Sequence, residues 1–225
     1  MINPGFCIVI PAYNAQKTLP SLLKEINNTQ YKPEKIFIID DGSNDKTVEI
    51  AKYYTNNIFS FPKNIGKGSA LKKGFQLFLS RSSEPYVLCM DADLQHSAGS
   101  IKDFILAAKK FNSKVVIGQR EINLAKMPFL RYLSNKITSF ILSYVCGQKI
   151  KDSQCGFRLI NRSVLENLEL NENGFQLESE FLIRCAQMRI PLTFINIPTI
   201  YNSNGSNIHH FSDTFKFIRL IINEF

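Results

Sequence analysis

The sequence contains no uninterrupted run of 18 or more apolar residues, so it predicts no membrane-spanning helix. The nearest approach is the segment 128–145, which Arg131, Asn135 and Lys136 interrupt. The sequence also lacks linker-like stretches, low-complexity segments and internal repeats, and its first residues lead into an apolar run rather than a signal peptide. We therefore expect the 225 residues to form a single domain with its own buried core.

Cysteine is scarce. The five cysteines are odd in number, widely spaced and mostly flanked by apolar residues. This pattern argues against a disulfide framework or a zinc-ligand set, and it favours reduced, mostly buried thiols in a cytosolic protein.

Lysine and arginine outnumber aspartate and glutamate by 27 to 19, which gives a net charge of +8. This excess favours an anionic partner such as a phosphorylated substrate or an anionic lipid, and a solvated basic surface is the alternative. No dense basic run with interleaved aromatic residues indicates nucleic-acid binding, so we expect no nucleic-acid partner.

Short apolar runs alternate with helix-like segments over the first 120 residues. The runs are continuously apolar, which predicts strands of a sheet that is covered on both faces. Strand–helix–strand repetition predicts right-handed crossovers and an α/β fold with a mostly parallel sheet. The expected strands are 6–10, 35–39, 86–90 and 114–117, and the expected helices are 19–27, 46–54, 68–79 and 100–111.

The pattern changes after about residue 125. A long amphipathic helix is expected from near Pro128. Its apolar face consists of Phe129, Leu133, Phe140 and Tyr144, with Ile137 close to it. Strands at 157–160 and 192–197, a helix at 177–188 and a final amphipathic helix at 211–225 complete the expected elements.

Polar residues follow the expected strands at the points where ligands bind parallel α/β sheets, which are the carboxyl ends of the strands. An aromatic residue, an acidic pair, an acidic triplet with an amide, and an arginine should therefore converge at one edge of the sheet. The loops concerned are 11–15, 40–43, 91–95 and 118–120.

Two of these loops, and the segment 64–68 before an expected helix, have a specific chemical interpretation. Asp91 and Asp93 are spaced to hold a hard divalent cation, to which Gln95 could add an amide oxygen, although Asp-x-Asp is also common in turns. The pair Asp40-Asp41 either forms a turn or accepts hydrogen bonds from a base or ribose. The segment 64–68, which contains Lys67 between two glycines, either cradles an anion at a helix N-terminus or forms a tight turn.

Taken together and in order, these motifs closely resemble those of the family 2 glycosyltransferases, and in particular the polyprenyl-phosphate branch that includes dolichyl-phosphate mannose and glucose synthases. The resemblance covers roughly residues 5–205. It rests on Pro11-Ala12-Tyr13-Asn14, Asp40-Asp41-Gly42-Ser43, Asn64-x-Gly66-Lys67-Gly68, Asp91-x-Asp93-x-Gln95 and Asp152-Ser153-Gln154-Cys155-Gly156-Phe157-Arg158.

The resemblance implies a GT-A fold, with a nucleotide-sugar-binding half at about 1–120 and an acceptor half with a C-terminal helix at about 121–225. It implies a nucleotide-sugar donor (GDP-mannose, UDP-glucose or UDP-N-acetylglucosamine) and Mg²⁺ or Mn²⁺. Ala15 departs from the acidic residue that is frequent in the family. The implied donor contacts are Pro11, Tyr13, Asp40, Asp41, Lys67, Asp91, Ala92 and Asp93, and the implied metal ligands are Asp91, Asp93 and Gln95.

The resemblance also implies transfer with inversion at the anomeric carbon. A phosphate acceptor is already an anion and needs cations, whereas a hydroxyl acceptor needs a general base. Arginine suits phosphate because its guanidinium binds in a bidentate manner. The expected acceptor-phosphate residues are Arg120, Arg131, Ser134 and Arg158, and the expected catalytic residues are Asp91, Asp93, Arg120 and Asp152.

Several interpretations stay open at this point. Asp152 is either a base for a hydroxyl acceptor or a residue that orients Arg158 and the acceptor loop, while the roles of Glu178, Glu180, His209 and His210 are unassigned. The apolar helices predict peripheral contact with the inner face of a membrane or with a membrane protein, and the alternative is that they pack on the core or on a homodimer partner. The rival functions are transfer to a hydroxyl of a glycan, a protein or another cell-envelope acceptor, sugar-nucleotidyl transfer and non-catalytic nucleotide binding.

Overall fold

The computed structural model describes residues 4–120, 129–200, 217 and 219–221, and this part of the chain builds one seven-stranded sheet in the order β3-β2-β1-β4-β6-β5-β7. β6 runs antiparallel to both of its neighbours, and every other pairing is parallel. The strands are β1 (Phe6–Ala12), β2 (Ile36–Asp40), β3 (Ile58–Ser60), β4 (Tyr86–Cys89), β5 (Val115–Arg120), β6 (Arg158–Asn161) and β7 (Leu192–Ile197).

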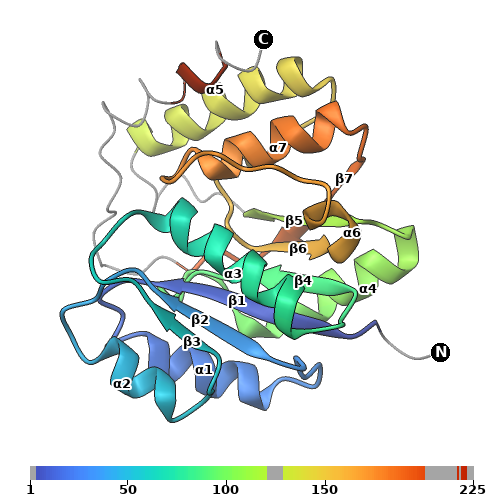
Figure 1. Cartoon of the computed structure of the whole chain (residues 1–225). Helices are drawn as coiled ribbons and strands as arrows, with labels where there is room; N and C mark the ends of the chain where they lie inside the picture. Colours follow the sequence, from blue (N-terminus) through green and yellow to red (C-terminus); the bar gives the residue numbers. More distant parts are fainter. Residues whose placement is uncertain (1–3, 121–128, 201–216, 218, 222–225) are drawn as a thin grey trace.

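Helices cover both faces of this sheet, as the continuously apolar strands require (Figure 1). One face packs against α1 (Leu19–Asn28), α2 (Thr47–Lys52), the short helix η1 (Ala98–Ser100) and α4 (Ile101–Phe111). The other face packs against α3 (Lys67–Arg81), α5 (Phe129–Cys146), α6 (Arg162–Leu165) and α7 (Leu177–Gln187).

The predicted α/β class and mostly parallel sheet are confirmed. Each expected strand, and each expected helix up to residue 188, has a counterpart whose bounds differ by a few residues. β3 and α6 were not predicted, because an edge strand of three partly exposed residues and a single helical turn carry little apolar periodicity. Of the expected last helix, residues 217 and 219–221 are helical, with Phe217 and Leu220 buried, and the rest lies outside the described residues.

The expected apolar face of helix α5 is exposed to solvent: Leu133 is 41% exposed, Ile137 49%, Phe140 75% and Tyr144 87%. The face that packs inward combines the fully buried Leu142 with the buried polar residues Asn135 and Ser139. The side chain of Phe129 lies outside the described part. Among the described helices, none combines the length and hydropathy needed to cross a bilayer.

Candidate active site

The strand directions bring the expected loops to one edge of the sheet. β1, β2 and β4 are parallel neighbours, and β5 points the same way because both β4 and β5 are antiparallel to β6. The start of β6 reaches the same edge, so the loop that contains Asp152 and Gly156 lies between the ends of β4 and β5. The predicted convergence is therefore confirmed, and the antiparallel strand adds a loop that strand-end reasoning from the first 120 residues did not include.

Lys67 forms the centre of the charged cluster at this edge. Its Nζ lies 2.7 Å from Asp91 Oδ1, 2.9 Å from Asp91 Oδ2 and 2.7 Å from Glu178 Oε1. Lys67 comes from the start of α3, Asp91 follows β4, and Glu178 lies in the first turn of α7. The two carboxylates raise the pKa of Lys67 above its usual value despite the opposing effect of burial. The cluster therefore joins residues 111 positions apart.

The two aspartates of the acidic triplet respond in opposite ways to this setting. Burial opposes ionisation of both carboxyl groups. For Asp91 the charge of Lys67 outweighs burial and lowers the pKa, whereas for Asp93 burial and the charge of Asp91 raise it. Asp93 Oδ1 also accepts the N–H of Gln95 at 3.0 Å.

This arrangement fits a divalent cation, because two mutually repelling carboxylates and a nearby amide offer the oxygen ligands that Mg²⁺ prefers. A cation would remove the repulsion that raises the pKa of Asp93. Within the described residues, no cluster of three or more His, Cys, Asp or Glu side chains has the geometry of a self-sufficient metal site. A cation held by Asp91 and Asp93 would complete its coordination with oxygens from water or from a bound ligand.

Asp40 and Asp41 turn out to hold the loops of this edge. Asp41 is 4% exposed, and its two oxygens accept the N–H groups of Ile65 and Gly66 at 2.9 Å each. Burial raises the pKa of Asp41 even though these hydrogen bonds oppose the shift. Asp40 is 1% exposed and accepts hydrogen bonds from Ser43 N and Ser60 Oγ. Both side chains are thus engaged in internal contacts, which is the turn interpretation of this pair.

The glycines of the segment 64–68 are needed for close packing against another loop. A Cβ on Gly66 would lie 2.4 Å from the carbonyl oxygen of Asn173, and one on Gly68 would lie 2.6 Å from the carbonyl carbon of the same residue. Gly66 also has a φ of +107°, a value that favours glycine. Ser69 N–H donates to the Asn173 carbonyl oxygen at 3.1 Å. The Asn173 loop therefore covers the N-terminus of α3, where an anion had been one of the two interpretations.

Glu180 holds that covering loop in place. Its side chain is 1% exposed, and its two oxygens accept the N–H groups of Asn171 and Glu172 at 2.8 and 2.9 Å. The acidic residue that sequence reasoning left unassigned therefore supports a loop of the site.

Pro11 and Ala92 are buried beside this edge, whereas Tyr13 directly after β1 is 41% exposed, so its ring is accessible for stacking on a base.

Arg120 and Asp152 form a buried bidentate ion pair. Arg120 Nε donates to Asp152 Oδ2 at 2.7 Å and Nη2 donates to Oδ1 at 2.9 Å, and the two residues are 8% and 1% exposed. Burial opposes the charge of Asp152, but Arg120 and the hydrogen bond from Asn135 outweigh it and lower the pKa of this carboxyl group. A carboxylate with a lowered pKa, enclosed by donors, is a poor general base. Asp152 therefore orients Arg120 and its own loop, whereas Arg158, its other expected partner, donates to backbone carbonyl oxygens instead.

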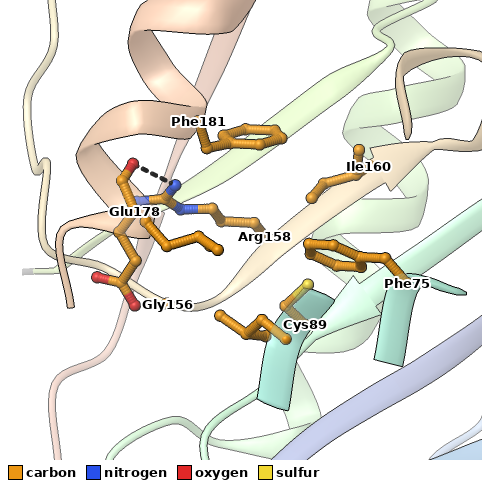
Figure 2. Close-up of a pocket in the computed structure, with 9 residues that line it drawn as sticks. Phe75, Cys89, Gly156, Arg158, Ile160, Glu178 and Phe181 are labelled. Carbon is orange, nitrogen blue, oxygen red and sulfur yellow. Dashed lines mark hydrogen bonds between the residues drawn. The ribbon is translucent and has the colours of Figure 1, made fainter. Parts of the chain in front are cut away.

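Arg158 serves the scaffold instead of presenting its charge to an acceptor phosphate. It is 4% exposed, and its guanidinium donates to the carbonyl oxygens of Cys155, Glu178 and Ser153 at 2.8, 2.9 and 3.0 Å. Figure 2 shows the Glu178 contact and the apolar side chains that surround Arg158 in a small cavity, including that of Phe181. The predicted phosphate role of Arg158 conflicts with this geometry, because its donors are already used inside the protein.

The polar face of α5 holds the Asp152 loop. Asn135, Ser139 and Ser143 recur every four residues and so share one face of the helix. Asn135 Nδ2 donates to Asp152 Oδ1 at 3.2 Å, and Ser139 Oγ accepts the N–H of Ser153 at 3.0 Å. Ser143 Oγ accepts the N–H of Ile150 at 2.9 Å. Sequence reasoning missed this stripe because it searched the helix for apolar residues.

The remaining expected residues are described unevenly. Ser134 is partly exposed and directly precedes Asn135, which donates to Asp152. Arg131 lies in α5, but its side chain is outside the described part, as are His209 and His210. Gln95 contributes its backbone N–H to Asp93 and its backbone carbonyl oxygen to Ile200.

His96, next to the acidic triplet, was not singled out from the sequence. Its ring stacks on Phe157 with centroids 5.3 Å apart, and Nδ1 is buried without a hydrogen-bond partner in the described part of the chain. Burial lowers the pKa of His96 to about 4 although the charge of Asp91 opposes the shift, so the imidazole is neutral at physiological pH.

The fold and the edge arrangement define an α/β protein of the GT-A type. The crystal structure of glucosyl-3-phosphoglycerate synthase from Mycobacterium tuberculosis superposes on 98% of this chain and 80% of its own chain, with a TM-score of 0.78 and 17% sequence identity. The chain belongs to glycosyl transferase family 2, whose model matches residues 7–169. The predicted family, fold and glycosyltransferase activity are thereby confirmed.

Curated relatives come from the branch predicted from the motifs. The chain is 36% identical over 225 aligned residues to a dolichyl-phosphate beta-glucosyltransferase of Trichomonas vaginalis, with 89% of this chain and 67% of the relative covered. It is 32% identical to the dolichol-phosphate mannosyltransferase of Pyrococcus furiosus, with 83% of this chain and 55% of the relative covered. The chain thus spans about half to two thirds of the length of these two relatives.

Proposed function

We propose that this glycosyltransferase transfers a sugar from a nucleotide-sugar to a polyprenyl phosphate, with inversion at the anomeric carbon and with the help of Mg²⁺ or Mn²⁺. The observation that carries the proposal is the Arg120–Asp152 ion pair. This ion pair engages Asp152, the carboxylate that would have acted as a base for a hydroxyl acceptor. It also leaves the guanidinium of Arg120 at the carboxyl end of β5, where we place the acceptor.

Two other carboxylates of the acceptor half near this edge, those of Glu178 and Glu180, are also engaged in internal contacts. Glu178 pairs with Lys67, and Glu180 accepts two backbone N–H groups. The three acidic side chains Asp152, Glu178 and Glu180 are therefore not available to remove a proton from a hydroxyl. A phosphate monoester needs no such base, because it attacks as an anion. The names of the curated relatives, which act on dolichyl or dolichol phosphate, agree with this acceptor class.

The donor would lie across the carboxyl ends of β1 and β4. Tyr13 presents a ring for the base, Asp91 and Asp93 with Gln95 offer oxygens to a divalent cation, and Lys67 supplies a fixed positive charge. A bound divalent cation offsets the charge that develops on the leaving nucleoside diphosphate. The structural neighbour has been solved with Mn²⁺, uridine-diphosphate-glucose and phosphoglyceric acid, which supports a nucleotide-sugar donor and a divalent cation.

On the acceptor side we assign the phosphate to Arg120, Arg131 and Ser134. Asp152 holds Arg120 through Nε and Nη2, so Nη1 is the guanidinium nitrogen that this pairing leaves for a phosphate oxygen. Ser134 lies one residue before Asn135, which contacts the same carboxylate. Arg131 is placed one turn earlier in the same helix.

The proposed reaction is tested by incubating the purified chain with labelled GDP-mannose, UDP-glucose or UDP-N-acetylglucosamine, Mn²⁺ or Mg²⁺, and a polyprenyl phosphate. We expect label to enter the organic phase with one donor, and Asp91→Asn to abolish it. Transfer to a soluble glycan or to a polyprenol, each of which offers a hydroxyl, with none to the polyprenyl phosphate, would refute the acceptor assignment.

We further propose that the exposed face of α5 contacts the surface of the membrane that holds the lipid acceptor. Phe140 and Tyr144 are among the most exposed aromatic residues described, and exposed Lys136, Lys149 and Lys151 lie near them in the sequence. An apolar face flanked by lysines suits an anionic lipid surface. Flotation with anionic vesicles at low and moderate salt tests this proposal, and a chain that stays with the bottom fraction or forms only homodimers contradicts it.

A further inference from the structure

Glu178 occupies a position that the reaction described above does not explain. Its side chain is 9% exposed, and its Oε1 lies 2.7 Å from Lys67 Nζ. The same Nζ contacts Asp91, the first residue of the acidic triplet, at 2.7 Å. Lys67 therefore bridges one carboxylate from each half of the chain.

The surroundings fix this bridge from several directions. The backbone carbonyl oxygen of Glu178 accepts Arg158 Nη1 at 2.9 Å, while its carboxylate points away from that arginine toward Gly156 (Figure 2). A Cβ on Gly156 would lie 2.7 Å from Asp91 Oδ2 and 3.0 Å from Lys67 Nζ, so the loop fits closely against the ion pair. Lys67 Nζ also lies 5.9 Å from the centroid of the Phe175 ring. The ammonium group consequently has little room to move away from its two carboxylates.

The bridge creates a competition at Asp91. A cation that binds Asp91 would lie close to the ammonium of Lys67, which contacts the same carboxylate, and the two positive charges would repel one another. If Asp91 were the only partner of Lys67, binding of a cation to Asp91 would leave a largely buried ammonium without a counter-charge. Leaving a buried charge unpaired costs free energy. Glu178 removes this difficulty, because Lys67 keeps a partner 2.7 Å away when Asp91 turns to the cation.

The charges of the cluster agree with this role. Asp91, Asp93 and Glu178 are carboxylates and Lys67 is an ammonium, so these four ionised side chains together carry a net negative charge, to which Glu178 contributes. Arg120 and Asp152 nearby form a neutral pair and leave this balance unchanged.

We propose that Glu178 is a positioning residue for the cation site: it retains Lys67 and supplies the charge that allows Asp91 to bind a divalent cation. The inference rests on the proposed function in that it takes Asp91 and Asp93 as cation ligands. It assigns to α7, in the acceptor half, a part in metal affinity, and it does so without any contact between Glu178 and the cation.

The test measures binding of Mn²⁺ alone by electron paramagnetic resonance, with the full chain and no nucleotide. We expect Glu178→Gln to weaken Mn²⁺ binding by roughly tenfold or more, as the loss of a group that supports a metal ligand usually does. Glu178→Asp keeps the charge and should recover most of the affinity. Glu166→Gln removes an equal charge from an exposed residue outside the cluster, and should bind Mn²⁺ like the parent.

A background that lacks the ammonium shows whether Glu178 acts through Lys67. In a Lys67→Met chain, Glu178→Gln should change Mn²⁺ affinity much less than it does in the parent, because contacting residues are not additive. Thermal unfolding of each variant identifies those that fail to fold, and if Glu178→Gln is one of them, Glu178→Ala, which also removes the charge, takes its place. Equal Mn²⁺ affinity in the parent and in Glu178→Gln overturns the inference, as do equal effects in both backgrounds or a parent whose Mn²⁺ binding does not require Asp91.

These results separate the inference from the proposed function. Sugar transfer to a polyprenyl phosphate with unchanged Mn²⁺ affinity in Glu178→Gln would overturn the inference alone. The expected Mn²⁺ pattern without transfer to any lipid phosphate would overturn the proposed acceptor alone. A raised KM for the nucleotide-sugar with unchanged Mn²⁺ affinity would make Glu178 a donor contact and would also overturn the inference.

Discussion

Replacing Asp152 by asparagine should destabilise the protein strongly, because the carboxylate neutralises a buried guanidinium. Arg120 donates to it at 2.7 and 2.9 Å, and Asn135 Nδ2 and Gln154 N–H donate to Oδ1 at 3.2 Å. Asparagine keeps the shape but loses the charge, and its amide group would turn a donor toward other donors. Removing one partner of a buried ion pair costs about 3–5 kcal/mol, and we expect a loss of this size for Asp152→Asn.

Urea unfolding measures this loss directly. With a slope of about 2–3 kcal/mol per molar urea for a chain of this size, the midpoint should fall by about 1–2.5 M. Glu169→Gln, an exposed residue that also loses one negative charge, is the control and should shift the midpoint little. The double variant Arg120→Met with Asp152→Asn should lose less than the two single variants together, because they share one interaction. A loss below about 1 kcal/mol for Asp152→Asn would refute the reasoning.

The pH dependence provides a second test of the same pair. The folded pKa of Asp152 is lowered, so its stabilising effect is present above its unfolded pKa of about 3.9 and is lost as the pH falls through the lower, folded value. The difference in unfolding free energy between the parent and Asp152→Asn should therefore be constant near neutral pH and shrink below about pH 4. A difference that grows as the pH falls would contradict the lowered pKa.

Three further changes test other parts of the structure. Gly156→Ala places a Cβ 2.7 Å from Asp91 Oδ2 and should lower both Mn²⁺ affinity and sugar transfer, measured by resonance and by product extraction, with little change in the urea midpoint. Ser139→Ala removes the acceptor of the Ser153 N–H and should cost about 1–3 kcal/mol of unfolding free energy in urea. The pair Phe140→Ser with Tyr144→Ser should weaken flotation with anionic vesicles by about tenfold or more without lowering the thermal midpoint, since both side chains are exposed.

Much of the donor side could be predicted because it depends on local patterns. Continuously apolar runs marked β1, β2, β4 and β5, and strand direction alone placed the residues that follow them at one edge. Asp91 was predicted in this way, whereas Lys67 was predicted from the glycines that flank it at the start of a helix. The direct pairing of Asp91 with Lys67 was not predicted, because strand order and helix position set the distance between two loops. Neither is encoded within a short segment.

The contacts of the acceptor side could not be predicted from the sequence, for a different reason. Its interactions join residues far apart in the chain, such as Glu178 with Lys67, and they reuse residue types that have ordinary surface roles. Arg158 looked like a phosphate ligand because arginine suits phosphate, but burial on β6 turned its donors toward three backbone carbonyls. Whether an arginine faces a ligand or the scaffold depends on which groups surround it in the fold, and the motif alone does not contain that information.

The ion pairs at the edge of the sheet connect the half of the chain that we assign to the donor with the half that we assign to the acceptor. Lys67 and Asp91 belong to the half that is assigned to the donor, yet Glu178 of α7 holds Lys67. Glu180, two residues further along α7, fixes the covering loop against the start of α3. A ligand that binds only the folded arrangement stabilises every contact on which that arrangement depends. Binding of a cation or donor should therefore stabilise α7 and its loop as well, so the half that receives the acceptor is ordered in part by the half that holds the sugar.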